Sequence, residues 1–449
     1  TNCILWDALD LLDGQPEIFD GADGQSIVTY SCIQGGYPGI DNASAGPRFV
    51  DARNNDLALR AGSPCIDTAS ATGAPATDAA GVARPQGEGV DMGAYEFADG
   101  VTAAYVVYVD VGNTEGPWDG ASWATAYSTL QEGVDAASAN GGGEVWAAAG
   151  DYAEAREDTA GALLLKPSVG LYGGFAGEET KGDPDKPKFE LLTKRDWNAN
   201  VTTIDASEAR YDTELGRYFP AYHAVIVSED VVLDGFTVTG GIADGSGEQG
   251  TGAGVYGVSA TATVAHCRIE GNTARNGAGL YATSASQLVL EACVFSANTA
   301  EFDGGGAVVT SFSEATLTDC RFEANEAGDH GGAIYCASSS ILGLDACVLA
   351  GNSAELDGGG LYASGQVQVS ATGCVFSENA STVSDGGGVH MTNAEIADYS
   401  NCVFAMNSAK DDGGAMAHVG GAPTLTNCTF VGNAAGGDGA GIYNSDADP

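Results

Sequence analysis

The sequence predicts an all-β fold, a right-handed parallel β-helix whose coils are about 27 residues long. Cysteine recurs from Cys267 to Cys428 at steps of 26, 27, 27, 27, 28 and 26 residues. Between the cysteines lie glycine runs followed by an apolar residue, as in DGGGLY and HGGAIY. Short alternating stretches such as ATLTDCRF suit strands separated by tight turns, and so many glycines disfavour helices. We expect three short strands and three turns in each coil.

A helix is expected to cap the first coil within residues 105–152. The stretch YVVYVDVG reads as a strand, and GGGEVWAAAGDY reads as a strand of the first coil. Between them, apolar residues recur at helical steps of four and three, with Ser122 or Asp119 as the N-cap. These residues are Trp123, Tyr127, Leu130, Val134 and Ala137. Such a helix would cover a sheet end that otherwise invites aggregation.

The rest of the chain divides into segments that differ in how regularly the 27-residue pattern repeats. Residues 153–250 are expected to form irregular coils with a surface loop over 181–220, and residues 251–449 form the regular repeats. Residues 1–98 resemble the end of such an array, because TNCILW matches TNCTF near the other terminus. Residues 99–104 would link the two parts.

Stacked coils place equivalent residues about 4.8 Å apart in columns. An asparagine column is expected to hydrogen-bond along the stack and satisfy buried turn groups. Its members are Asn272, Asn298, Asn325, Asn352, Asn379, Asn407 and Asn433. A phenylalanine column should point inward and stack. Its members are Phe295, Phe322, Phe376, Phe404 and Phe430.

Ten of the eleven cysteines are expected in one column, with Cys336 as the outlier. The column would hold Cys3, Cys32 and Cys65 besides the seven cysteines of the regular repeats. Disulfides between neighbouring coils are one possibility, since the spacing lies in the required Cα range. In-register strands aim both side chains the same way, however, which favours buried free thiols that pack as small apolar residues.

The phrases FSAN, FEAN, FSEN and FVGN alternating with GGAI resemble the FxxN and GGA[ILV] repeats of the polymorphic outer-membrane protein adhesins. More broadly, the chain resembles bacterial surface proteins with right-handed parallel β-helix repeats. The resemblance covers residues 251–449 and extends more loosely upstream. It implies a secreted, β-helical, adhesive or structural protein located outside the cell or on its surface. It brings no catalytic residue with it.

An aspartate column could bind a metal. Asp357, Asp385, Asp412 and Asp438 occupy equivalent positions ahead of the glycine runs. One explanation is turn chemistry, because Asp-Gly favours tight turns. The other is Ca²⁺ held between the carboxylates and turn carbonyls, and no other cofactor is expected.

The last coil is expected to dock with another molecule. About eleven coils give a stack roughly 50 Å long, whereas residues 99–104 span at most about 20 Å. Residues 1–98 would then cover the open end of a neighbour, and a contact that does not close makes a filament. The docking residues would be Cys3, Ile4, Leu5 and Trp6 against Cys428, Phe430, Ile442 and Tyr443. The alternatives are one period of a larger tandem array, self-capping by an extended 66–98 segment, and a monomeric or tandem adhesin that binds a receptor or glycan.

The net charge of the chain restricts the binding partners that we expect. The formal net charge of −44 repels nucleic acid and anionic lipid, so we expect the chain itself, a cell surface or glycans as partners. No stretch approaches the roughly 20 apolar residues of a membrane helix. No enzyme is expected, because the five histidines His223, His266, His330, His390 and His418 show no metal spacing. Arg268 and Arg321 read as solvated surface residues.

Overall fold

The structure is a computed structural model, and it divides the chain into two compact units, residues 1–103 and 104–449. It describes residues 1–5, 26–33, 38–43, 47, 49–51, 56–59, 63–87, 89–97, 106–154, 161–179, 195–212, 217–420 and 423–445. Trp6 and much of the expected loop at 181–220 lie outside these residues. The two units are described separately below.

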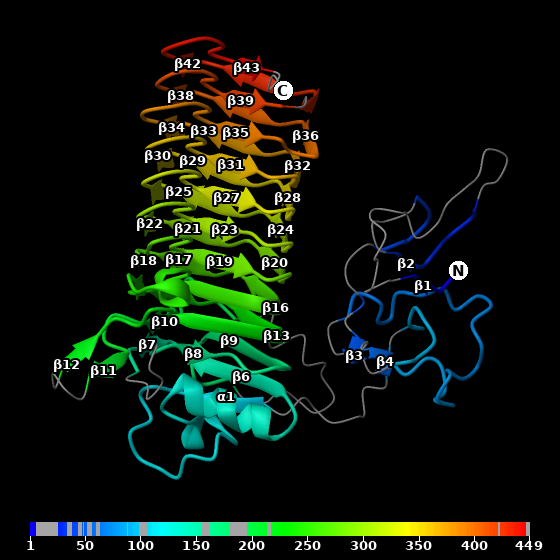
Figure 1. Ribbon diagram of the computed structural model, residues 1–449. Coiled ribbons are helices and arrows are strands. Elements are labelled where there is room, and N and C mark those ends of the chain that lie inside the picture. The colour runs from blue at the N-terminus through cyan, green and yellow to red at the C-terminus, as the bar shows by residue number, and fades with distance from the viewer. Residues whose placement is uncertain are drawn as a thin grey trace. The chain divides into compact units, whose positions relative to one another are not determined.

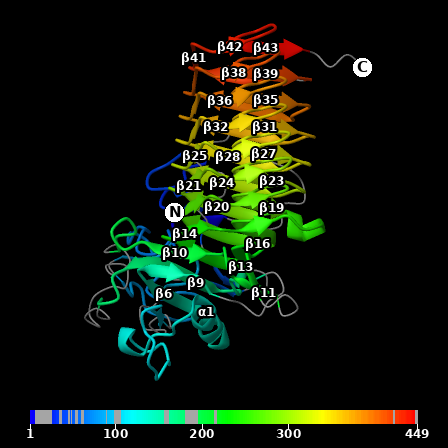
Figure 2. The same ribbon diagram turned by 90° about the vertical axis from the view of Figure 1, so that its left-hand side faces the viewer.

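Residues 104–449 form a right-handed parallel β-helix whose coils stack along one axis (Figure 1; Figure 2 shows the same stack turned by 90°). A regular coil is β27 (Ile334–Ala337), β28 (Ile341–Asp345), β29 (Val348–Ala350) and β30 (Ser353–Ala354). This coil has four strands where three were expected, because the short stretch after the asparagine also pairs with its neighbours. Each strand pairs in parallel with the equivalent strand of the next coil.

Two of the parallel sheets are simple columns of short strands. The first contains β7 (Gly150–Tyr152), β10 (Thr202–Asp205), β14 (Thr237–Thr239), β17 (Arg268–Glu270), β21 (Val294–Ser296), β25 (Arg321–Glu323), β29, β33 (Val375–Ser377), β37 (Val403–Ala405) and β41 (Thr429–Val431). The second contains β15 (Ile242–Ala243), β18 (Thr273–Ala274), β22 (Thr299–Ala300), β26 (Glu326–Ala327), β30, β34 (Ala380–Ser381), β38 (Ser408–Ala409) and β42 (Ala434–Ala435).

The remaining parallel sheet begins with strands of two to eleven residues and then splits into two rows. Its first strands are β5 (Val106–Val109), β6 (Gly143–Ala148), β8 (Leu163–Leu164), β9 (Val169–Phe175), β13 (Val225–Asp234) and β16 (Val255–Ala265). One row continues as β19 (Leu280–Thr283), β23 (Ala307–Val309), β27, β31 (Leu361–Ser364), β35 (Val389–Thr392), β39 (Met416–Val419) and β43 (Ile442–Ser445). The other continues as β20 (Gln287–Glu291), β24 (Glu314–Thr318), β28, β32 (Gln368–Thr372), β36 (Ile396–Ser400) and β40 (Thr424–Thr426).

Helix α1 (Leu130–Ala139) covers the first coil, with a 3₁₀ turn at Trp123–Thr125 before it. The helix is shorter than expected, and the N-cap is Thr129 instead of Ser122 or Asp119: the Thr129 hydroxyl accepts from the Glu132 N–H. Gly133 lets the helix approach the sheet, because a Cβ there would lie 2.4 Å from a methyl carbon of Val109. None of the helices in the described residues has the length and apolar character needed to span a lipid bilayer.

The residue before each repeat cysteine takes the left-handed conformation that the coil needs to turn its corner. Five of these residues are of types that tolerate this conformation and have φ between 51° and 64°: His266, Asp319, Gly373, Asn401 and Asn427. Ala292 and Ala346 adopt the same conformation, at 50° and 52°. Tertiary pairing therefore imposes this backbone even where the residue type does not favour it.

The interior of the β-helix is a set of apolar columns. Phe295 and Phe322 stack with centroids 4.5 Å apart, and the stack Phe376–Phe404–Phe430 has spacings of 4.9 and 4.7 Å. The cysteines from Cys267 to Cys402 are buried free thiols. Each column thiol from Cys293 to Cys402 has its single S–H within reach of two carbonyl oxygens, one two residues earlier and one in the preceding coil, as Cys347 has those of Asp345 and Leu317. Burial raises the pKa of the Cys336 thiol, which lies on another face, to about 12.

The N-terminal unit contains β1 (Ile4–Leu5), β2 (Cys32–Ile33), β3 (Phe49–Asp51) and β4 (Asp56–Leu59). β1 and β2 pair in parallel, whereas β3 and β4 pair antiparallel. A small core holds Cys32, Leu59, Cys65 and Met92. A buried ion pair of 3.1 Å between Arg84 and Glu96 ties the segment after residue 63 together, and Arg84 also donates to two backbone carbonyls.

Candidate functional site

The last described coil of the β-helix, β40–β43, presents a partly exposed inner face. Phe404 in the coil before it is fully buried, whereas Phe430, one step further along the same column, is only half-buried. Cys428 and Tyr443 are half-buried, and Ile442 is 38% exposed. Within the described residues, no further strand pairs with β41, β42 or β43 beyond this coil. In the last described coil these side chains of the apolar columns are therefore partly accessible.

The start of the N-terminal unit repeats the local geometry of this last coil. The tripeptide Thr-Asn-Cys occurs at residues 1–3 and again at 426–428. The asparagine has φ of 60° in the first copy and 55° in the second. In each copy the thiol donates to the threonine carbonyl oxygen, at 3.4 and 3.5 Å. β1 therefore begins as a strand of the β-helix does.

The residues expected to dock are partly accessible. Cys3 is exposed, and Leu5, two residues later, is half-buried. Ile4, between them, points to the opposite face and packs against the core around Cys32. Trp6 lies outside the described residues. The predicted face of β1 thus carries Cys3 and Leu5, while Ile4 belongs to the interior of the N-terminal unit.

The prediction that Cys32 and Cys65 extend the cysteine column is wrong. Cys32 pairs with Ile4, so Ser31 occupies the position equivalent to Cys3. The Ser31 hydroxyl donates to Thr29 O, as the column thiols donate two residues back. Cys32 and Cys65 pack together in the small core of the N-terminal unit instead. A serine can take the column position because its hydroxyl makes the same local bond.

The asparagine column is a continuous ladder. From Asn272 to Asn407, the backbone N–H and the side-chain Nδ2 of each residue both donate to Oδ1 of the next asparagine, at 2.9–3.1 Å. Nδ2 also donates to a carbonyl of the preceding coil, as Asn352 does to Phe322 O at 2.9 Å. The six asparagines up to Asn407 are fully buried. The column is structural, because every amide group is used inside the coil corner.

The aspartate column is also a ladder, but a weaker one. Asp385 N donates to Asp357 Oδ1 at 3.0 Å, and Asp412 N and Asp438 N donate to the preceding carboxylates at 2.7 and 2.5 Å. The carboxylates have no side-chain donor comparable to the asparagine amides. Burial raises the pKa of Asp385, and the neighbouring carboxylates Asp357 and Asp412 add to the effect. These contacts are the turn chemistry expected of Asp-Gly.

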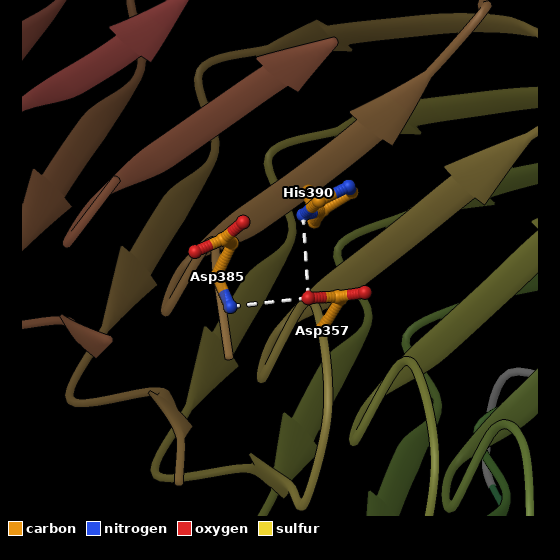
Figure 3. Close-up of side chains that lie close together, drawn as sticks. All are labelled: Asp357, Asp385 and His390. Atoms are coloured by element: carbon orange, nitrogen blue, oxygen red, sulfur yellow. Dashed lines mark hydrogen bonds and ion pairs between the residues drawn. The ribbon is translucent and has the colours of Figure 1, made fainter. Parts of the chain in front are cut away.

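His390 lies close to two of these aspartates; the dashed lines of Figure 3 join its ring to Asp357, and Asp357 to the backbone N of Asp385. Its Nδ1 lies 3.6 Å from Asp357 Oδ1, and ligand atoms of Asp357, Asp385 and His390 all lie within 4.8 Å of one another. Burial lowers the pKa of His390, while the two carboxylates oppose that shift. Asp412 and Asp438 are not part of this group. Two of the four aspartates expected to bind Ca²⁺ thus lie in a cluster with one imidazole, and Ca²⁺ binding by the column stays a prediction.

Sequence reasoning passed over His390 because it searched for spacing between histidines. The column that contains the aspartates continues upstream as His330, Asp303 and Asn276, and the informative signal lies five residues after each of its positions. It reads Tyr281, Val308, Tyr335, Tyr362, His390, Ala417 and Tyr443. These residues are in register along one row of strands, so His390 replaces a tyrosine in a column that runs beside the aspartates. The rings of Tyr335, Tyr362 and His390 stack at spacings of 5.4 Å.

Arg268 and Arg321 lie on the surface, as predicted. Arg268 pairs with Glu270 at 3.1 Å, and Arg321 pairs with Glu323, each across two residues of one strand. Both arginine side chains are about half exposed, 55% and 51%. His266 pairs with Asp234 at 3.0 Å beside the buried Arg195, which holds the segment after residue 195 on the coil. These groups are explained by local ion pairing.

The comparisons with known proteins agree on the architecture. The family described as the right-handed beta helix region matches residues 221–376. No curated protein matches the chain. The coils described above and this match show the same fold.

Several solved structures are similar to the chain. The A-module of the Azotobacter vinelandii mannuronan C-5 epimerase AlgE6 has 14% identity and a TM-score of 0.35, over 76% of this chain and 100% of that one. The pectin methylesterase of Aspergillus niger has 15% identity and a TM-score of 0.31, over 77% and 90%. PfbA, a surface adhesin of Streptococcus pneumoniae, has 12% identity and a TM-score of 0.28, over 75% and 93%. At these scores the similarities carry no argument about activity or binding.

Proposed function

We propose that the chain is a structural subunit of an acidic extracellular filament. In this proposal, the face of β1 that carries Cys3 and Leu5 adds to the last coil of another molecule, below Cys428 and Phe430. The matched geometry of the two Thr-Asn-Cys tripeptides is the observation that carries the proposal. Among the described residues β1 has one strand partner, β2, and the proposal places the new strand at its other edge. Addition of a strand to a sheet edge supplies main-chain hydrogen bonds as well as side-chain contacts.

The apolar columns support the same register. With Cys3 placed in line with Cys428, Leu5 falls in line with Phe430, which is half-buried on the open coil. In the β-helix itself this position is filled by buried apolar residues, such as Phe404, Phe376 and Leu349. Leu5 would therefore extend the column and remove Phe430 from water, a gain of roughly 1–3 kcal/mol for each side chain buried.

Electrostatics opposes the association. Every subunit carries a formal charge of −44, so long-range repulsion slows the encounter at low salt. The docking residues are themselves neutral. We therefore expect assembly to be faster and stronger at high ionic strength, where the repulsion is screened.

The test is electron microscopy of the purified full chain at high salt, together with thiol labelling. Wild-type protein is expected to form fibres, and Cys428, half-buried in the monomer, should be protected from maleimide in the fibre. Leu5→Asp should abolish fibres because it places a charge in the joined column. Ile27→Asp is the matched control, since Ile27 is 89% exposed in the same unit. Fibres formed by Leu5→Asp as readily as by wild type would refute the proposal.

A surface adhesin that acts as a monomer or tandem domain is the second candidate. The outward side chains of β20, β24, β28 and β32 are mostly short or polar and lie on one continuous sheet. They include Gln287, Glu291, Thr316, Ser370 and Thr372. Rows of such groups at the spacing of β-strands suit a linear, repetitive ligand such as a glycan. The resemblance of the FxxN and GGA[ILV] phrases to adhesin repeats points the same way.

The two candidates are separated by the Leu5→Asp variant. A filament subunit loses its assembly and any function that depends on it. An adhesin keeps full binding to cells or immobilised polysaccharides in this variant, and wild-type protein remains a discrete particle in the microscope.

A further inference from the structure

Asp357, Asp385 and His390 come together from two successive coils. The aspartates occupy the turns before β31 and β35, and His390 is the second residue of β35. The ring of His390 is held in place by stacking on Tyr362, with centroids 5.4 Å apart. Among the residues that the structure describes, this is the group of histidine, cysteine and acidic side chains close enough to share a metal ion.

His390 is buried, with 5% of its surface exposed, and its Nδ1 has no hydrogen-bond partner among the described residues. Its Nε2 lies 3.0 Å from Thr392 Oγ1. A proton on Nε2 that is donated to the hydroxyl leaves the Nδ1 lone pair aimed at the Asp357 carboxylate. Two acceptors facing each other across 3.6 Å repel, and a cation between them removes the conflict.

The distance between His390 and Asp357 fits an ion of small radius. Zinc-class metals bind imidazole nitrogen and carboxylate oxygen at about 2.0–2.2 Å, so two ligands at a tetrahedral angle lie about 3.4 Å apart. The observed 3.6 Å between Nδ1 and Asp357 Oδ1 is close to that value. The Thr392 hydroxyl would orient the ring through its other nitrogen, as partners of metal-bound histidines commonly do.

The surrounding contacts leave room for the ion. Asp357 Oδ1 accepts from Asp385 N, and Asp385 Oδ1 accepts from Asp412 N. Each carboxylate oxygen has a second lone pair, so these bonds do not exhaust its capacity. His330 lies on the far side of Asp357, with Nδ1 3.5 Å from Oδ2. Imidazole is a ligand of zinc, copper, nickel and iron, whereas Ca²⁺ and Mg²⁺ take oxygen ligands.

We propose that Asp357, Asp385 and His390 bind a divalent metal ion of the zinc class, with its remaining coordination positions open to water or an acidic ligand. The ion joins two neighbouring coils at the flank of the β-helix. Asp412 and Asp438 continue the carboxylate column but share no such group with a histidine among the residues that the structure describes, so the proposed site is confined to this junction.

The test is calorimetric titration of Zn²⁺ into the chelator-treated full chain, followed by Co²⁺ as a spectroscopic probe. We expect one site, and a visible Co²⁺ absorption typical of nitrogen and oxygen coordination. His390→Phe keeps the stacking on Tyr362 but removes both nitrogens, and should weaken Zn²⁺ binding at least tenfold. Asp385→Asn keeps an oxygen acceptor for Asp412 N and should also weaken it at least tenfold. Asp412→Asn is the matched control from the same column and should change affinity less than twofold.

Other outcomes overturn the proposal. If His390→Phe and Asp385→Asn bind Zn²⁺ as wild type does, the ion is held nonspecifically by the acidic surface. If Ca²⁺ competes at similar concentration, the site uses oxygen ligands alone. If wild type binds no Zn²⁺, a proton shared between His390 and Asp357 resolves the contact instead.

Discussion

The asparagine and aspartate columns run along the same β-helix with the same period, yet they satisfy the main-chain N–H groups of the turns with different side-chain chemistry. In both, a side-chain oxygen accepts a main-chain N–H from a neighbouring coil, as in Asn325 N to Asn352 and Asp385 N to Asp357. The asparagines also donate twice through Nδ2, to the next amide and to a carbonyl. The aspartates have nothing to donate.

The difference decides where each column can lie. An amide ladder is neutral and satisfies itself, so the asparagines up to Asn407 are fully buried. A carboxylate ladder accumulates negative charge and keeps unused lone pairs, so its members remain half-exposed or exposed at the flank. Two histidines lie close to Asp357: His330 is a member of the same column, and His390 is in the neighbouring column. A column of carboxylates is thus stabilised by nearby positive charge, whereas a column of amides is neutral and does not require it.

Replacing an asparagine of the buried column by aspartate should have the largest effect on stability. Asn352→Asp removes the Nδ2 donor to Phe322 O and Asn379 and places a charge where no water reaches. We expect a loss of about 3–5 kcal/mol in the free energy of unfolding, as for an uncompensated buried charge. Denaturant unfolding at neutral pH measures it.

Asn444→Asp is the control for that exchange, because Asn444 is exposed on β43. It makes the same chemical change without burial and should leave stability within about 0.5 kcal/mol of wild type. A loss below 1 kcal/mol for Asn352→Asp would show that the ladder contributes little.

The pH dependence of the unfolding free energy at Asp303 measures how much a buried carboxylate in the aspartate column destabilises the fold. Burial raises its pKa, and its Oδ1 is buried without a hydrogen-bond partner among the described residues. A carboxyl whose folded-state pKa is raised favours the folded state below its unfolded pKa, and that contribution is lost as the pH rises through the folded pKa. Asp303→Asn should therefore match wild type near pH 3 and exceed its stability by about 1 kcal/mol at pH 7.

The measurement for Asp303→Asn is the unfolding free energy across this pH range. Asp345→Asn serves as the control, since Asp345 is exposed. A pH dependence unchanged by Asp303→Asn would mean that another group carries it.

The regular coils were predictable because each residue type repeats its role. The period, the inward phenylalanines and the left-handed position before each cysteine follow from local chemistry repeated seven times, as at Asn401 and Asn427. The cap of α1 was misplaced because Thr129 competes with Ser122 for the same function, and only the packing of Leu130 and Val134 against the sheet decides between them.

The N-terminal unit and the metal cluster were less predictable because they depend on register. In the N-terminal unit one extra residue moves Cys32 to the opposite face and gives its column position to Ser31. His390 is five residues from Asp385 but a full coil from Asp357, so their proximity appears only when the columns are aligned. The repeats can be predicted from the sequence pattern alone. The neighbours of a residue that departs from the repeat can be predicted only when the register between coils is known.

The smallest effect on stability is expected from removing one charge, that of Asp412, within the aspartate column. Asp412→Asn keeps an oxygen for Asp438 N and removes a carboxylate that lies between those of Asp385 and Asp438. Like charges opposite each other on neighbouring strands cost about 0.2–1 kcal/mol, so the variant should gain roughly 0.5 kcal/mol at low salt. The gain should vanish near 1 M salt, where the screening length falls to about 3 Å. Unfolding midpoints at both salt concentrations measure it, and a gain that persists at high salt would mean that the aspartate is unfavourable for reasons other than its charge.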